Sequence, residues 1–151
     1  MINYIRTDSK NKEFRKLVRE LDMELQIRDG EDHSFYAQFN KIDKIKYVIV
    51  AYDDEVAVGC GAIKVYSADS MEVKRMYVLP KSRGQGIASL ILKALEQWAM
   101  ELSYIKCLLE TGEKQPEAIA LYKKNGYNII PNFGQYENVA NSVCFGKKLT
   151  T

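Results

Sequence analysis

The chain has 151 residues, of which 46% are apolar and 28% charged, and we expect residues 1–151 to form one globular domain. This composition excludes disordered and fibrous proteins, and the length leaves little room for a second domain. The 22 basic and 20 acidic residues give a net charge of +2, which argues against the broad basic surface of a nucleic-acid-binding protein.

The sequence also limits the compartment and the metal chemistry. No apolar run reaches the roughly 18 residues of a membrane-spanning helix, and the first residues lack the apolar stretch of a signal peptide, so we expect a cytoplasmic protein with no membrane partner. The three cysteines, Cys60, Cys107 and Cys144, are far apart in apolar stretches, which excludes a disulfide framework and a CxxC site. With His33 as the only histidine, we expect no metal site.

The first half of the chain combines a helical pattern with β-rich runs. Apolar residues at three-and-four spacing predict an amphipathic helix over residues 11–28, and a weaker helical turn is expected over residues 31–39. Residues 47–52 and 56–66 are β-rich and joined by an acidic turn, which predicts a hairpin. A third β-rich run over residues 71–79 stops at Pro80 and extends the hairpin into a meander.

The second half alternates between strands and helices. An apolar stripe predicts a helix over residues 87–102, and a short strand follows at residues 105–109. Pro116 begins the next helix, which Gly126 is placed to end in a left-handed conformation. With final β segments at residues 127–130 and 142–149, the order is β-α-(α)-β-β-β-α-β-α-β-β, which predicts a mixed α/β fold with a largely antiparallel central sheet flanked by helices.

The loop at residues 83–88, Arg-Gly-Gln-Gly-Ile-Ala, is the motif that carries chemistry. It lies between a strand and a long helix, where unpaired N–H groups and the helix dipole favour a bound anion, and its glycines let a phosphate approach the backbone. The loop lacks the Gly-Lys-Ser/Thr of a P-loop, and Ser89 stands where a dinucleotide-binding loop needs a third glycine. The sequence therefore predicts a phosphate site of another kind.

The same loop fits the pattern Gln/Arg-x-x-Gly-x-Gly/Ala, with Arg83, Gly86 and Ala88 in the specified positions. This pattern marks the pyrophosphate loop of the GCN5-related N-acetyltransferases, the GNAT family. The preceding run EVKRMYV at residues 72–78 and the segment AIALYKKNGY at residues 118–127 also resemble that family. The resemblance is strong over residues 71–127, and it implies the acyl-CoA N-acyltransferase fold and acetyl-CoA as cofactor.

The resemblance also implies where acetyl-CoA binds. The amides of residues 85–89 would hold its pyrophosphate, with Arg83 and Lys81 nearby. Residues 76–78 would diverge from the strand ending at Glu110 and pair with the pantetheine arm, so that the amide of Val78 or Met76 polarises the thioester carbonyl. Many members have Asn where this chain has Gln115. The implied cofactor-binding residues are Met76, Tyr77, Val78, Arg83, Gly84, Gln85, Gly86, Ile87, Ala88, Ser89, Gln115 and Tyr122.

Direct transfer to an amine requires proton transfer, because an amine with a pKa of about 10 is mostly protonated at neutral pH. Glu72 lies eleven residues before Arg83, the spacing of the catalytic glutamate in the histone-acetylating branch of the family. It is the expected general base; the alternatives are a solvent-facing Glu72 paired with a lysine, and Glu110 as the base. Tyr122 matches the tyrosine that usually acts as general acid, although a helix tyrosine can also be a packed aromatic.

The acceptor site is the least specified part of the sequence. The acidic stretch of Asp29, Glu31 and Asp32 with His33 could attract a cationic amine or be a solvated loop. Phe133, Tyr136 and Glu137 lie between the last two strands and could wall the acceptor pocket or cover the sheet. The candidate substrate-binding residues are Asp29, His33, Glu110, Phe133 and Tyr136.

We therefore expect an acetyl-CoA-dependent N-acetyltransferase that transfers acetyl directly to a primary amine of a small molecule, with no cysteine nucleophile and no covalent enzyme intermediate. One alternative is an acetyltransferase of protein N-termini or lysines. Another is a non-catalytic module that senses acyl-CoA. Dimers are frequent in the family, and the final strands are a candidate homodimer interface.

Overall fold

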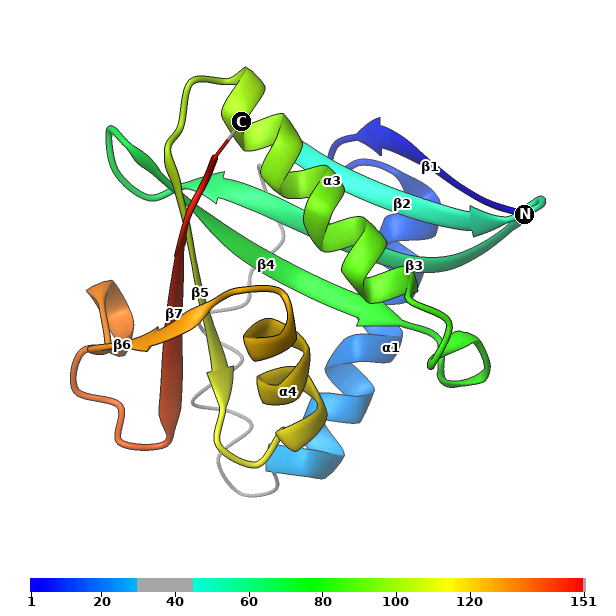
Figure 1. Cartoon of the computed structure of the whole chain (residues 1–151). Helices are drawn as coiled ribbons and strands as arrows, with labels where there is room; N and C mark the ends of the chain where they lie inside the picture. The colour runs from blue at the N-terminus through cyan, green and yellow to red at the C-terminus, as the bar shows by residue number, and fades with distance from the viewer. Residues whose placement is uncertain (30–44, 151) are drawn as a thin grey trace.

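The computed structural model describes residues 1–29 and 45–150, and the expected helical turn at residues 31–39 lies outside them. Within the described residues, seven strands form one sheet in the order β1-β2-β3-β4-β5-β7-β6 (Figure 1). The strands are β1 (Ile2–Thr7), β2 (Tyr47–Asp53), β3 (Val56–Val65), β4 (Ser70–Val78), β5 (Lys106–Gly112), β6 (Asn128–Ile130) and β7 (Ser142–Lys148). The helices are α1 (Lys12–Asp29), α3 (Ile87–Glu101) and α4 (Pro116–Lys124), with 3-10 turns η2 (Pro80–Ser82) and η3 (Gly134–Tyr136).

The antiparallel part of the sheet follows the predicted meander. β2 and β3 form the expected hairpin, and Asp54 turns the chain between them with φ 54°. β3 pairs with β4, and β1 adds antiparallel to β2 as an edge strand. The predicted mixed, largely antiparallel α/β fold is confirmed.

Helix α1 covers one face of β2, β3 and β4 (Figure 1). Its first turn is capped by Asn11, whose Oδ1 accepts a hydrogen bond from the backbone N–H of Phe14 at 2.9 Å. The predicted apolar stripe is buried against the sheet, with the members Phe14, Leu17, Val18 and Leu21. The helix therefore forms because one face can be buried, as its sequence pattern predicts.

Helix α3 packs on the opposite face, against β2, β3, β4 and β5. Its buried residues include Glu96, a carboxylate that the apolar stripe did not predict to lie in the core. Glu96 Oε2 accepts a hydrogen bond from the Tyr127 hydroxyl at 2.9 Å, and its Oε1 pairs with Lys147 Nζ at 2.8 Å. These partners compensate the desolvation of the charge. Among the described helices, none is long and apolar enough to cross a membrane.

Helix α4 begins and ends at the predicted residues. Pro116 stands in its first turn, where the missing N–H costs nothing. Gly126 has φ 88°, and the next residue, Tyr127, donates its N–H to the carbonyl of Tyr122 at 3.0 Å. The left-handed glycine therefore ends the helix and turns the chain into β6.

Strands β4 and β5 are the only parallel neighbours among the described strands, and their pairing is short. It covers Ser70–Glu72 on β4 and Lys106–Leu108 on β5. Beyond these residues the two strands diverge (Figure 1). The divergence leaves one edge of β4 without a strand partner among the described residues, as the family resemblance implied.

An extra residue in β4 changes its direction at Arg75. Ala62 of β3 pairs with Lys74, and Cys60 pairs with Tyr77, so two steps along β3 oppose three along β4. This is a β-bulge, which bends a strand and increases its twist. Arg75 has φ 61° there, a left-handed conformation that costs a residue other than glycine about 1–3 kcal/mol.

The bulge also changes which face each side chain occupies. Val73 and Met76 both pack against the α3 core, although strict alternation would separate two positions three residues apart. Arg75 instead reaches α1, where it pairs with Asp22. Two adjacent cations, Lys74 and Arg75, therefore follow each other on the side of β4 that faces α1.

We predict that Gly61→Ala destabilises the protein, because Gly61 lies opposite the bulge with no room for a side chain. A Cβ atom there would lie 2.5 Å from Met76 Sδ, 2.9 Å from Ile91 Cγ2 and 3.0 Å from Leu95 Cδ1. Such overpacking costs about 1–3 kcal/mol in the free energy of unfolding, measurable by urea denaturation. Gly112→Ala is the control, since its nearest atom, Gln115 Nε2, would be 3.6 Å away. Equal stability of the two variants would contradict the prediction.

Candidate active site

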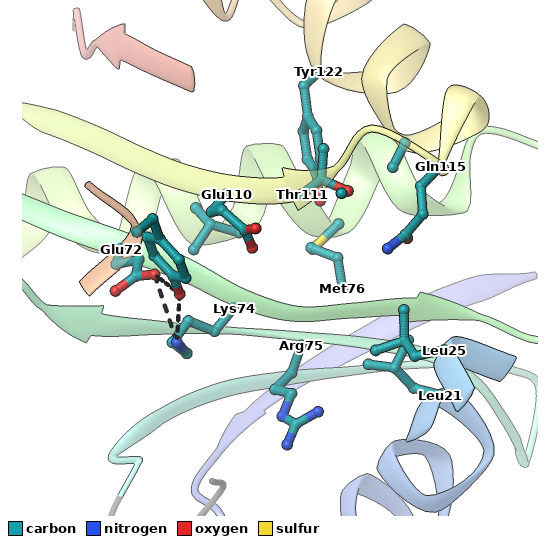
Figure 2. A pocket seen from close by; sticks show the side chains of 14 residues that line it. Leu21, Leu25, Glu72, Lys74, Arg75, Met76, Glu110, Thr111, Gln115 and Tyr122 are labelled. Atoms are coloured by element: carbon teal, nitrogen blue, oxygen red, sulfur yellow. Dashed lines mark hydrogen bonds and ion pairs between the residues drawn. The ribbon is translucent and has the colours of Figure 1, made fainter. Parts of the chain in front are cut away.

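A cavity of about 120 Å³ lies where β4 and β5 diverge (Figure 2). Helices α1 and α4, strands β4 and β5 and the turn η3 contribute to it, which explains why residues far apart in the sequence meet there. Its lining residues are Leu21 and Leu25 of α1, Glu72, Val73, Lys74, Arg75 and Met76 of β4, Glu110, Thr111 and Gly112 of β5, Gln115, Ala118 and Tyr122 at α4, and Tyr136 of η3.

The cavity has two chemically different sides. Figure 2 shows Lys74 and Arg75 extending from β4 toward the side of α1, while Met76 extends toward Tyr122. The α4 side is lined mainly by residues that pack in the α3 core, such as Met76 and Ala118, and its polar groups are Thr111, Gln115 and the Tyr122 hydroxyl. The α1 side carries the charges of β4.

Tyr122 extends from α4 into the cavity toward Thr111 (Figure 2). Its ring is 7% exposed and contacts Tyr127 and Phe145 edge-on or tilted. Burial, and after it the negative charge of Glu110, raises the pKa of the Tyr122 hydroxyl. The hydroxyl is therefore protonated at neutral pH and available as a proton donor.

Glu72 is 9% exposed and lies at one end of the cavity in a polar cluster. Its Oε2 accepts a hydrogen bond from the Tyr136 hydroxyl at 2.9 Å and lies 3.5 Å from Lys74 Nζ. Burial, and then the charge of Glu72, raises the pKa of Tyr136, which keeps that hydroxyl a donor. Glu72 does pair with a lysine, but inside the cavity wall and not on an exposed surface.

Glu110, the rival base, is a second carboxylate in the same cavity. Its Oε2 accepts a hydrogen bond from Ser142 Oγ at 2.6 Å. The predicted strand ends at residue 109, but β5 continues to Gly112, and this extension brings Glu110 beside the cavity. Both candidate bases therefore line the cavity that Tyr122 enters, and Glu110 is close enough to raise the pKa of the Tyr122 hydroxyl.

The aromatic residues of the last loop form a row of which only one member lines the cavity. Tyr136 lines it, whereas Phe133 packs edge-on behind Tyr136, with ring centroids 5.5 Å apart. Tyr66 continues the row at 5.1 Å from Phe133. The loop is thus an ordered wall, with Phe133 supporting Tyr136.

The glycine loop at residues 83–88 has the geometry of an anion site. Gly84 and Gly86 have φ 81° and 80°, and no described heavy atom lies within 4 Å of where a Cβ atom would stand on either residue. Gly86 is the N-cap of α3; no side chain caps this described helix end, and its first turn has no acidic residue. The first N–H groups of α3 thus have no side-chain cap among the described residues, and the space beside both glycines is open, so the loop fits a phosphate ligand.

Other implied cofactor residues either support this loop or lie along β4. Asn125 Nδ2 donates a hydrogen bond to Ser89 Oγ at 3.1 Å and so connects α4 to the start of α3. Ile87 is buried in the α3 core. Gln115 is the N-cap of α4 and lines the cavity.

Arg83 has a different environment from the one expected for a residue near a pyrophosphate. Its Nε donates to the carbonyl of Val78 at 2.8 Å, its Nη2 pairs with Glu24 of α1 at 2.9 Å, and its guanidinium lies 5.4 Å from the centre of the Tyr77 ring. Arg83 therefore connects the loop to β4 and α1 through its side chain.

The three cysteines are poor nucleophiles. Cys60, Cys107 and Cys144 are buried and form no disulfide. Burial raises their pKa values to about 12, about 12 and about 11, respectively. Because the thiolate is the reactive form, these thiols are unreactive at neutral pH, which agrees with transfer that uses no cysteine intermediate.

Two predicted site residues cannot be placed in the cavity. His33 lies outside the described residues, together with Glu31 and Asp32, and Asp29 is the last residue of α1 with a side chain that is not described. Sequence reasoning in turn missed Lys74 and Arg75. The signal was present, since the apolar positions change phase between Val73 and Met76, as they do at a bulge.

Comparison with known proteins identifies the fold. A family model described as "Acetyltransferase (GNAT) family" matches residues 12–127. The chain belongs to this family. A crystal structure from Klebsiella pneumoniae, provisionally named an acyl-CoA N-acyltransferase, has a TM-score of 0.84 and 29% identity, and the match covers 99% of each chain. The PaiA N-acetyltransferase of Thermoplasma acidophilum, solved with coenzyme A, shares the GNAT fold at TM-score 0.71 and 18% identity over 98% of this chain and 99% of that one.

Curated GNAT relatives match the chain over part of their length. The "IAA acetyltransferase" of Azospirillum brasilense is 40% identical over 89 residues, 58% of each chain. The "Uncharacterized N-acetyltransferase YjgM" of Escherichia coli K12 is 41% identical over 87 residues, 56% of this chain and 52% of that protein. The chain thus spans just over half the length of these curated relatives.

Proposed function

We propose that this GNAT-family chain is an acetyl-CoA-dependent N-acetyltransferase that transfers acetyl directly to a primary amine of a small molecule. The observation that carries the proposal is the cavity between β4 and β5, which brings a buried tyrosine and two carboxylates together beside an unpaired strand edge. Proton donor, proton acceptor and backbone groups are what amide formation from a thioester requires.

The described residues fit acetyl-CoA, which would supply an acetyl group activated as a thioester. The open space at Gly84 and Gly86 supports binding of the pyrophosphate by the backbone of residues 84–89. The edge of β4 at residues 76–78, which has no strand partner among the described residues, would hydrogen-bond the pantetheine arm through the backbone groups other than the Val78 carbonyl, which accepts from Arg83. A backbone N–H of this edge would stabilise the negative charge that develops on the thioester oxygen.

Glu72 is the proposed general base. It lines the cavity and is held in position by Tyr136 and Lys74, so its carboxylate has a fixed orientation. It would remove a proton from the acceptor ammonium, directly or through water, so that the neutral amine can attack. Glu110 is the second candidate, because it lines the same cavity.

Tyr122 is the proposed general acid. A tyrosine hydroxyl is protonated at neutral pH even at its ordinary pKa of about 10, and burial raises the pKa of the Tyr122 hydroxyl further. The side chain extends into the cavity from the α4 side (Figure 2). A thiolate leaving on this side of the cavity is also poorly solvated, which raises its own affinity for a proton. Proton transfer from Tyr122 would therefore assist departure of the thiol.

The acceptor side supports a small molecule in preference to a peptide. Leu21 and Leu25 of α1 and Tyr136 of η3 all wall the cavity, which suits a compact acceptor better than an extended peptide. A comparison of small amines with peptides that carry a free N-terminus or a lysine tests this choice. Preferential acetylation of the peptides would contradict it.

We expect the purified protein to bind acetyl-CoA with micromolar affinity in isothermal titration calorimetry. Gly86→Glu should weaken binding at least about tenfold, because it puts a negative charge at the start of α3 and a side chain where φ is 80°. Gly126→Glu is the matched control, since Gly126 also has a positive φ, 88°, but lies outside the loop. No binding by the unsubstituted protein at millimolar acetyl-CoA would refute the proposed cofactor.

We predict that Tyr122→Phe lowers kcat about 100-fold while changing the Kd of acetyl-CoA much less, because only proton donation is lost. Thiol release and calorimetry measure the two quantities. Tyr127→Phe is the control, because it removes another buried hydroxyl, whose partner is Glu96. This variant should be less stable than the wild-type protein but should have nearly the same kcat. An unchanged kcat in Tyr122→Phe would remove its role as acid.

Substitution of the two carboxylates should separate the candidate bases. Without the general base, only the fraction of the amine that is already neutral in solution can react. Glu72→Gln should therefore lower the rate at pH 7 and move the pH–rate profile toward the pKa of the amine. The profile of Glu110→Gln should keep the wild-type position. The reverse result would assign the base to Glu110.

A further inference from the structure

Arg75 is buried in the wall of the cavity with part of its hydrogen-bonding capacity unused. Its side chain is 4% exposed, and its Nη1 donates to Asp22 Oδ1 at 2.9 Å. Its Nε, in contrast, has no hydrogen-bond partner among the described residues. Buried guanidinium groups normally have all their donors satisfied, so this atom requires an explanation.

The backbone conformation of Arg75 is also unusual. The residue has φ 61° at the bulge, where glycine would fit without strain. The bulge places Arg75 next to Lys74 on the α1 side of the cavity (Figure 2). A strained arginine with a free donor on this side has the features of a binding residue.

The free donor matches a carboxylate. A guanidinium presents N–H groups in a planar fork that fits the two oxygens of a carboxylate, and Asp22 occupies only Nη1. Asp22 itself is 47% exposed in its side chain, so its ion pair with Arg75 lies at the boundary with solvent and not deep in the core. Arg75 lines the cavity, but its Nε has no exposed surface, so a ligand oxyanion would reach the Nε edge only when the side chains that cover it move aside.

The charges of the cavity show which ligand would carry this carboxylate. Tyr122 and Gln115 lie on the opposite, α4 side, which the proposed function gives to acetyl-CoA. On the remaining side, Lys74 already pairs with Glu72. The carboxylates of Glu72 and Glu110 suit an ammonium group, and Arg75 suits an anion. A ligand with both charges is a zwitterion.

We infer that the acceptor is a small amine that also bears a carboxylate, such as an amino acid, and that Arg75 binds this carboxylate. The inference rests on the proposed transferase function and adds the chemical class of the acceptor. Arg75 is thus a specificity-determining residue, distinct from the groups that move protons.

The test compares L-amino acids with their primary amides, which keep the amine and the side chain but lack the negative charge. Thiol release from acetyl-CoA gives kcat/KM for each member. For the best amino acid we expect a ratio of acid to amide of at least about ten, the discrimination of one charge-assisted hydrogen-bonded pair. Amidation also lowers the pKa of the amine, so the intrinsic reactivity favours the amide and makes the comparison stringent.

Arg75→Gln should reduce the ratio of acid to amide to one or below, and Arg75→Lys should give an intermediate ratio, since it keeps the charge but not the planar fork. Asp22→Asn tests whether Arg75 acts only through its ion pair with Asp22. This variant should keep or raise the ratio of acid to amide. Thermal unfolding and the Kd of acetyl-CoA show whether each variant folds. If Arg75→Gln does not fold, the acid-to-amide ratios of Arg75→Lys and of the wild-type protein still test whether Arg75 binds the carboxylate.

The possible failures can be told apart. Equal or better turnover of amides or polyamines by the wild-type protein, or an unchanged ratio in Arg75→Gln, would overturn the inference and leave the proposed function intact. Binding of acetyl-CoA without transfer to any acid, amide, polyamine or peptide would overturn both.

Discussion

The extra residue in β4 is the constraint on which the candidate site depends. A regular strand would alternate its side chains between α1 and α3, but the bulge at Arg75 returns Met76 to the α3 core and leaves Lys74 and Arg75 next to each other on the α1 side. The bend accompanies the separation of β4 from β5. This local irregularity therefore accounts for the two adjacent cations in the cavity wall, and it lies just after the point where β4 loses β5 as its strand partner among the described residues.

The two faces of the sheet give the cavity two sides with different chemistry. The α3 core continues to α4, so the side with Tyr122 and Met76 is lined mainly by core residues and suits a thioester arm. The side toward α1 has Glu72, Lys74 and Arg75, whose charges are partly neutralised by each other and by Asp22. Such ion pairs compensate part of the desolvation cost of the buried charges, and they leave some donors and acceptors for a ligand.

Local signals predicted the elements well, because helices and hairpins depend on neighbours in the sequence. The cap at Asn11, the first-turn Pro116 and the left-handed Gly126 all act within a few residues. The site depended on distant contacts: nothing near Glu72 predicts its partner Tyr136, which is 64 residues away in the sequence. The phase change before Met76 was visible in the sequence, but only the pairing with β3 shows that Arg75 faces α1.

The short parallel pairing of β4 and β5 divides the sheet into two plates, β1 to β4 and β5 with β7 and β6, which share a seam of three residue pairs. Helix α3 packs against strands of both plates. Beyond the seam, the separation of the plates is set by side-chain packing and not by backbone hydrogen bonds. The width of the cavity is therefore a property of the core, and substitutions far from any reacting group can change it.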